Sequence, residues 1–295
     1  YQVYPRSFND SNGDGIGDIP GLIEKLDYLE NLGIDVIWLS PMYPSPNDDN
    51  GYDISDYKGI MSEFGTMNDF DQLLSSIHQR GMKLILDLVV NHTSDEHPWF
   101  IESKSSKTNA KRDWYIWADP KPDGSEPNNW ESIFNGSTWE FDESTKQYYF
   151  HLFSKKQPDL NWENPDVRQA VFEMMNWWFE KGIDGFRVDA ITHIKKNFEA
   201  GDLPVPDGKK FAPAFDVDMN QPGIQEWLQE MKDKSLSRYD IMTVGEANGV
   251  TPNDAEEWVG EENGKFNMIF QFEHLGLWST GDTKFDVKSY KQVLN

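Results

Sequence analysis

The sequence predicts an α/β fold, and within that class a (β/α)8 TIM barrel with a small subdomain inserted after its third strand. Short apolar runs alternate with longer segments whose apolar residues recur at helical spacing, as in parallel strands joined by crossover helices. Three of these apolar runs end on an acid or lead into a histidine. A barrel places its functional groups at the carboxyl ends of several strands, which matches this pattern.

A doubly wound open sheet is the alternative architecture. Such a sheet usually has a glycine-rich phosphate loop after its first strand, and no such loop follows the first predicted strand here. Six strands alone would leave two unpaired edges. We therefore expect a barrel whose last strands are missing from these 295 residues.

The first three strand–helix units are predicted before residue 93. Large apolar residues alternate over 1–8, which predicts the first strand. A leucine stripe at 20–32, opened by proline and closed by glycine, predicts a helix. The apolar run at 35–40 predicts the second strand, and the stripe at 70–77 the next helix. The run KLILDLVV at 83–90 predicts the third strand.

Residues 93–160 interrupt this alternation. They are rich in Trp, Asn, Asp, Pro and Gly, show no periodic helix, and contain one β-like segment at 147–153. This stretch is too long for a loop inside a compact domain. We therefore expect an inserted subdomain at 93–160, with the barrel portion formed by 1–92 and 161–295.

The barrel pattern resumes after the insertion, which brings the expected total to six strand–helix units. The further predicted elements are a helix at 166–181, a strand at 183–189, a helix at 224–236, a strand at 241–246, a short helix at 254–259, a strand at 266–272 and a helix that begins near Phe285.

Charged side chains near the ends of three predicted strands suggest one active site. Arg187 and Asp189 lie two residues apart on the fourth strand, so their side chains share a face. A structural ion pair would explain these two residues alone. The third strand carries Asp87 and leads to His92, and the fifth ends on Glu246. Because parallel strands end at a common edge, we expect these groups to meet.

The segment after the first strand predicts a structural calcium site. Oxygen ligands recur at the first, third, fifth and ninth loop positions, and a carbonyl is available at the seventh, as in the first part of a calcium loop. The twelfth position is a glycine, so the bidentate glutamate of an EF-hand is missing, and a plain polar turn is the alternative. The expected ligands are Asp10, Asn12, Asp14, Ile16 and Asp18.

Composition narrows the classes of partner. The formal net charge is −24, which argues against nucleic acid because phosphate binding needs a basic surface. No apolar run approaches the roughly 20 residues of a membrane span. The absence of cysteine excludes disulfides and thiolate metal sites. We expect a cytoplasmic monomer that binds neither nucleic acid nor membranes.

Five motifs resemble those of the α-amylase superfamily of glycoside hydrolases (glycoside hydrolase family 13), and within it the oligo-1,6-glucosidase and α-glucosidase branch. They are GYD at 51–53, DLVVNH at 87–92, QPDLN at 157–161, GFRVD at 185–189 and GEAN at 245–248. Each motif is modest alone, but this order on these strands is specific, and the resemblance covers essentially the whole chain.

The chemistry of the motifs and the resemblance imply the same catalytic roles. A retaining glycosidase uses one carboxylate as nucleophile and one carboxylic acid as proton donor. Asp189 is the expected nucleophile, because Arg187 on the same face favours its ionised form. Glu246 is the expected acid/base, which requires a raised pKa.

The resemblance further implies that Tyr52, Asp53 and His92 hold the glucose unit that is cleaved. A core aromatic is the alternative for Tyr52, and an ordinary hydrogen-bonded histidine for His92. The family also has a His-Asp motif on its seventh strand, which lies beyond Asn295. We therefore expect residues 1–295 alone to hydrolyse little or nothing.

Two signals disagree on linkage. The QPDLN motif at 157–161 resembles the oligo-1,6-glucosidase form, whereas Ala190 follows the nucleophile where α-1,6-specific relatives tend to have valine. A methyl-sized difference changes preference by about 1–3 kcal/mol. We expect exo-acting cleavage of α-1,4-linked glucose from short maltooligosaccharides, with α-1,6 cleavage as the alternative.

Three other functions compete with a glucosidase. A sucrose isomerase or another transglucosidase is compatible with these residues. A trehalose-6-phosphate hydrolase is disfavoured, because no basic cluster for the phosphate accompanies the expected site. A catalytically inactive barrel, like the amino-acid-transporter heavy chains, is disfavoured because Asp189 and Glu246 are both present.

Overall fold

The computed structural model describes residues 1–278 and 286–294, and its main feature is a parallel sheet. The described residues form six strands in the order β1-β2-β3-β7-β8-β9, with every neighbouring pair parallel. Their bounds are β1 Gln2–Val3, β2 Val36–Leu39, β3 Lys83–Val89, β7 Gly185–Asp189, β8 Met242–Glu246 and β9 Met268–Phe270. This curled sheet is a partial (β/α)8 barrel, as the sequence predicts.

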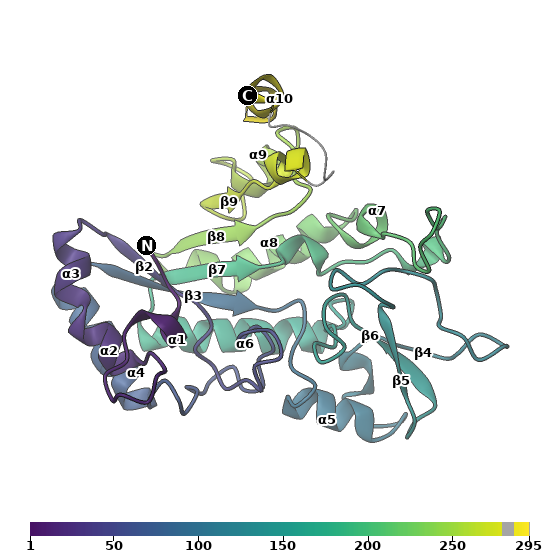
Figure 1. Cartoon of the computed structure of the whole chain (residues 1–295), viewed down its shortest axis with the longest axis horizontal. Helices are drawn as coiled ribbons and strands as arrows, with labels where there is room; N and C mark the ends of the chain where they lie inside the picture. Colours follow the sequence, from purple (N-terminus) through teal and green to yellow (C-terminus); the bar gives the residue numbers. More distant parts are fainter. Residues whose placement is uncertain (279–285, 295) are drawn as a thin grey trace.

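Helices connect and cover these strands (Figure 1). The α-helices are α1 Pro5–Phe8, α2 Ile19–Glu24, α3 Leu26–Asn31, α4 Met67–Gln79, α5 Pro98–Ser105, α6 Pro165–Lys181, α7 Phe215–Asp218, α8 Ile224–Lys234, α9 Ala255–Val259 and α10 Val287–Leu294. The 3-10 helices are η1 Arg112–Trp114, η2 Ile191–His193, η3 Phe198–Ala200, η4 Leu236–Arg238 and η5 Glu273–Trp278. No helix of the described residues is long and apolar enough to cross a membrane.

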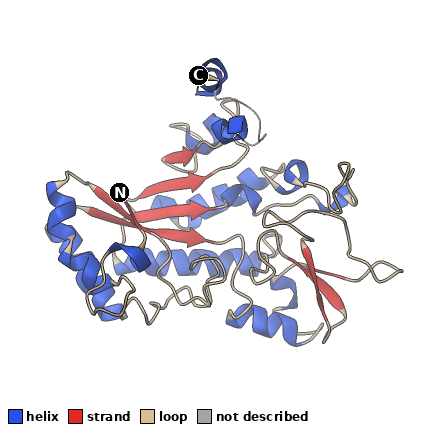
Figure 2. Cartoon of the chain, viewed as in Figure 1, coloured by secondary structure: helices blue, strands red, loops and turns tan. Residues whose placement is uncertain are grey.

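A second sheet lies within the predicted insertion. It is antiparallel, in the order β4-β6-β5, with bounds Trp117–Ala118, Gln147–Phe150 and Trp139–Asp142 respectively. Figures 1 and 2 show it beyond the ends toward which the arrows of β3 and β7 point. The insertion therefore stands beside the sheet edge at which the functional residues were expected.

Three local predictions were wrong. Residues 1–8 are not one strand, because Pro5 opens α1 after β1, and proline suits a first helical position. The helix predicted at 20–32 is two helices that break at Lys25. The insertion contains α5, which pattern analysis missed because Trp99, Phe100 and Ile101 are consecutive rather than spaced along one face. The position of Phe285 lies outside the described residues.

One glycine sets the approach of the two strands that carry the carboxylates. Gly185 opens β7 with φ 150°, and a Cβ there would lie 1.7 Å from the carbonyl oxygen of Met242 in β8. Any larger residue would push the two strands apart. Gly185 therefore helps to fix the distance between β7 and β8, and with it the positions of Asp189 and Glu246 at the ends of these strands.

Candidate active site

One guanidinium joins three carboxylates at the carboxyl ends of the strands. Asp189 and Glu246 are the last residues of β7 and β8, and Asp87 of β3 is in register with Arg187 of β7. Nη1 of Arg187 donates to Oδ1 of Asp87 at 2.7 Å and also to Asp189, while Nη2 donates to Glu246. The structure thus brings together the four charged groups that the three strand patterns predicted.

Burial dominates the electrostatics of this cluster. It raises the pKa of Asp189 well above the usual range, and repulsion from Glu246 and Asp87 adds to the rise, although Arg187 opposes it. Burial likewise raises the pKa of Asp87, which is 1% exposed. Arg187 does lower the pKa of Asp189, as expected from the sequence, but burial raises that pKa by more. Three carboxyls around one cation hold a proton readily, and a retaining pair needs one proton.

Two aromatic residues fix the arginine. Nε1 of Trp38 donates to Asp87 at 2.7 Å, and the Tyr52 hydroxyl donates to the same carboxylate oxygen at 3.3 Å. The guanidinium carbon lies 5.1 Å from the Trp38 ring centroid and 5.7 Å from that of Tyr52. Burial raises the pKa of Tyr52, so its hydroxyl remains a donor. These contacts hold Arg187 between the carboxylates.

His92 is buried at the edge of the site and is neutral. Its Nε2 lies 3.2 Å from the Tyr52 carbonyl oxygen and 3.1 Å from the side-chain nitrogen of Gln157. Burial lowers the pKa of His92 to about 4. The imidazole can therefore exchange hydrogen bonds with a ligand without carrying charge near neutral pH.

A buried ion pair connects the site to the insertion. The Lys196 ammonium lies 2.5 Å from the Asp159 carboxylate and donates to the Asn91 amide oxygen at 2.9 Å. The Asn91 amide also donates to Asp159 at 3.0 Å. Sequence analysis did not single out Lys196, because a lysine in a polar segment carries no signal. This network anchors Asn91, the neighbour of His92, to both the insertion and the barrel portion.

The two expected catalytic carboxylates lie in the wall of a cavity of about 240 Å³. Its walls are Asp49, Tyr52, His92, Phe134, Phe153, Arg187, Asp189, Ala190 and Glu246. Ligand pockets commonly measure roughly 300–1,000 Å³, so this one suits a small ligand. Sequence analysis missed the two phenylalanines, since single aromatic residues in an irregular segment have no pattern.

The structure places Asp53 away from this cavity. Asp53 is 0% exposed and does not line the walls. Its carboxylate accepts from the backbone amides of Asp48 at 2.8 Å and Asp49 at 3.0 Å, and from the Ser45 hydroxyl. Asp53 therefore shapes the loop, and Asp49 presents its carboxyl to the cavity instead.

Ala190, the residue after the expected nucleophile, lines the cavity in an unusual conformation. Its φ is 44°, in the left-handed region, and its side chain is 6% exposed. A β-branched residue is strongly disfavoured in that region. Ala190 is thus placed where a larger side chain would change both the wall and the local backbone.

The predicted calcium loop is ordered by its own side chains. Asp10 accepts backbone N–H bonds from Asn12 and Gly13 on one oxygen and from Gly15 at 2.7 Å on the other. Asn12 and Asp14 each accept one from the residue two positions on. A carboxylate can accept about four such bonds, so capacity for a cation remains. Among the described residues, no three His, Cys, Asp or Glu side chains form a metal-holding group, and calcium stays a proposal.

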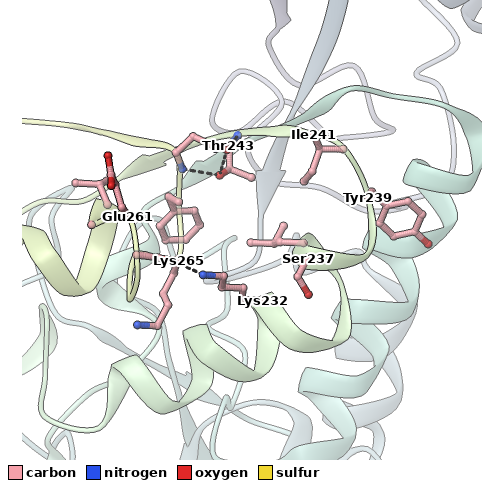
Figure 3. Close-up of a pocket in the computed structure, with 13 residues that line it drawn as sticks. Lys232, Ser237, Tyr239, Ile241, Thr243, Glu261 and Lys265 are labelled. Carbon is pink, nitrogen blue, oxygen red and sulfur yellow. Dashed lines mark hydrogen bonds between the residues drawn. The ribbon is translucent and has the colours of Figure 1, made fainter.

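Another cavity, of about 370 Å³, lies near the start of β8, away from Glu246 at its end, and none of the predicted site residues lines it (Figure 3). There the Lys232 ammonium donates to the Gly264 carbonyl at 2.6 Å, and the Thr243 hydroxyl bonds the Asn267 amide oxygen at 3.0 Å. Lys232 and Thr243 thus bond to other residues of the same wall, which favours a structural role for this part of it.

The matching family model is the alpha amylase catalytic domain, which covers residues 2–295, and the chain belongs to this family. The chain is 63% identical over 295 residues to probable oligo-1,6-glucosidase 3 of Bacillus subtilis, covering 100% of this chain and 53% of that protein. It is 60% identical over 290 residues to the oligo-1,6-glucosidase of Parageobacillus thermoglucosidasius, covering 98% and 51%.

Solved structures agree with this assignment. The Bacillus licheniformis trehalose-6-phosphate hydrolase superposes with a TM-score of 0.92 at 49% identity, over 100% of this chain and 53% of that one. The isomaltulose synthase of Protaminobacter rubrum gives 0.92 at 46%, with the same coverage. The chain therefore spans about half the length of the curated relatives it matches.

Proposed function

We propose that this chain carries the catalytic carboxylates of an exo-acting, retaining α-glucosidase that releases terminal glucose from short α-glucoside oligosaccharides. The observation that carries the proposal is the single guanidinium of Arg187 bridging Asp189 and Glu246 in a small cavity. Carboxyls bonded to two nitrogens of one guanidinium are close neighbours. Retaining enzymes need roughly 5–5.5 Å between them, whereas inverting enzymes need roughly 6.5–9.5 Å.

The proposed reaction has two displacements. Glu246 gives its proton to the glycosidic oxygen while Asp189 attacks the anomeric carbon, so the bond to the leaving alcohol breaks as a glucosyl ester forms. Glu246 then removes a proton from water, whose oxygen attacks the anomeric carbon and frees Asp189. Arg187 bonds both carboxylates throughout and compensates the charge that moves between them.

The activity is proposed for the full-length protein. The named relatives are about twice as long as the segment that matches them. We propose that further strands complete the barrel and supply the third acid expected from the family resemblance. Experiments on activity therefore use the full-length protein.

The α-1,6 linkage is the first proposed target, which reverses the order of preference drawn from the sequence. Two relatives of 60–63% identity bear the name oligo-1,6-glucosidase, and the QPDLN motif points the same way. The α-1,4 linkage is the second candidate, supported by Ala190 in the cavity wall.

Measuring kcat/KM on isomaltose and maltose decides between these linkages. We expect isomaltose to be preferred in the unmodified protein. If the unmodified protein prefers maltose and Ala190→Val shifts this preference toward isomaltose, the α-1,4 linkage is the target. Turnover of neither sugar would refute the proposed function.

Trehalose-6-phosphate hydrolysis and sucrose isomerisation are the alternatives, because solved relatives are named trehalose-6-phosphate hydrolase and isomaltulose synthase. Among the described residues that line the cavity, Arg187 is the one cation, and three carboxylates already share it. A phosphate ester is thus poorly matched. Incubation with sucrose and analysis of the products distinguishes an isomerase, which would yield an isomeric disaccharide, from a hydrolase.

We also propose a cytoplasmic monomer without nucleic-acid partners. The net charge of −24 and the absence of cysteine support this proposal. Cell fractionation with size-exclusion chromatography tests it, and a stable dimer or a secreted product would contradict it.

A further inference from the structure

A third cavity, of about 460 Å³, lies between the start of α5 and residues 170–174 of α6. We name it the aromatic groove. Its main wall residues are Tyr57, His97, Trp99, Lys111, Trp114 and Glu173, and none of these lines the catalytic cavity. The groove therefore needs an explanation separate from the catalytic carboxylates.

Two half-buried indoles form a corner of this groove. The ring centroids of Trp99 and Trp114 are 4.9 Å apart at an interplanar angle of 72°, and the Tyr57 ring lies 5.8 Å from Trp99. The Lys111 ammonium lies 5.1 Å from the Trp114 centroid and pairs with Glu102 at 2.9 Å. Such exposed cation–π contacts are weak, about 0.5–1 kcal/mol. The corner thus offers ring surface that a ligand can cover.

His97 supplies an N–H donor in the wall of the groove. The residue is 4% exposed, and its Nδ1 accepts the backbone N–H of Trp99 at 3.1 Å. Burial lowers the pKa of His97 to about 3, so the ring is neutral and its proton is on Nε2. Nε2 has no hydrogen-bond partner in the part of the chain that the structure describes. This atom is not one of the fully buried polar atoms that lack a partner among the described residues, so it is accessible and can donate to a ligand in the groove.

The combination of ring surface, donor and acceptor matches one ligand class. His97 donates from the segment before α5, and the exposed Glu173 carboxylate accepts from α6. Sugar hydroxyls both donate and accept, and the C–H faces of a pyranose pack against aromatic rings. Small-molecule sites commonly have this mixture of aromatic walls and few polar groups, at this volume.

We propose that the aromatic groove is a second binding site for gluco-oligosaccharides, separate from the catalytic cavity. The choice of a glucose-based ligand rests on the proposed function. The Tyr57 hydroxyl donates to the carbonyl oxygens of Val89 at 2.8 Å and His92 at 3.2 Å. One wall of the groove is therefore bonded to the backbone at the end of β3, next to His92 of the catalytic cavity.

The test uses Ala170, which lines the groove from α6. Ala170→Arg fills the groove with a long side chain while keeping a good helix former. Gln72→Arg adds the same charge at an exposed position of α4 that does not line the groove. Each variant is made in the full-length protein that also carries Glu246→Gln, which prevents turnover, and is titrated with isomaltotriose by calorimetry.

We expect two binding events in the Glu246→Gln protein and in its Gln72→Arg derivative. Ala170→Arg should weaken one event at least tenfold and leave the other unchanged. A single event that Ala170→Arg does not alter would overturn the proposal.

The failure of this proposal can be told from failure of the proposed function. Ala170→Arg alone should hydrolyse a small aryl α-glucoside with unchanged kcat/KM, which also shows that it folds. If the unmodified protein hydrolyses no α-glucoside, the proposed function fails, while the binding events in the groove can still be counted.

Discussion

The catalytic cluster and the 10–18 loop are both rich in aspartate, but they satisfy their charges in different ways. In the cluster, Asp87, Asp189 and Glu246 share the guanidinium of Arg187. In the loop, the exposed Asp10 accepts backbone amides of its own turn. The first arrangement makes protonation depend on neighbouring side chains, whereas the second makes backbone conformation depend on the acid. Acidic residues alone thus say little until their burial is known.

Removing the shared cation should have the largest effect. Arg187→Met leaves buried carboxylates without a counter-charge, and breaking a buried pair costs about 3–5 kcal/mol. Urea unfolding at pH 7 measures the loss. The control is Arg6→Met, which removes a more exposed pair with Glu63 and should cost about 1 kcal/mol. Equal losses in both variants would mean that burial does not separate the two kinds of site.

The loop should respond to calcium and the cluster should not. We propose that calcium binds the loop, so saturation at about 100 times Kd would stabilise the protein by about 2.7 kcal/mol. Asp14→Ala should abolish the rise in melting temperature that calcium produces, with kcat at low temperature largely unchanged. A melting temperature of the unmodified protein that is the same in calcium and in chelator would refute the calcium proposal.

Neutralising the nucleophile should stabilise the fold. Burial raises the folded-state pKa of Asp189 above its ordinary 3.8, so the stability linked to its proton is full below that value. This stability is lost as pH rises through the raised pKa. Asp189→Asn cannot ionise, and should gain about 1–2 kcal/mol at pH 8 while losing activity. The gain should vanish below about pH 4, and a gain that persists there would contradict the electrostatic cause.

The strand ends could be predicted from the sequence because each signal was local. The apolar run at 83–90 and the acids at Asp189 and Glu246 fix a strand and its end together, since buried parallel strands tolerate charge mainly at their carboxyl ends. The four charged residues of the cluster consequently meet as expected.

The loops could not be predicted in the same way. Asp53 and Asp49 are both aspartates of one loop, so the sequence cannot tell them apart. Only the folded loop shows that backbone amides bond Asp53 while Asp49 lines the cavity. Lys196 shows the same limit, because its partner Asp159 is distant in sequence and the pair becomes visible only when the insertion folds against the barrel.

The central claim is that Arg187 holds Asp189 and Glu246 close enough for a double displacement. Proton NMR of the glucose released from an aryl α-glucoside by the full-length protein tests it most directly. The account predicts that the α-anomer appears first and then mutarotates to the equilibrium mixture. Initial release of the β-anomer would show single displacement by water, and would contradict the roles assigned to both carboxylates.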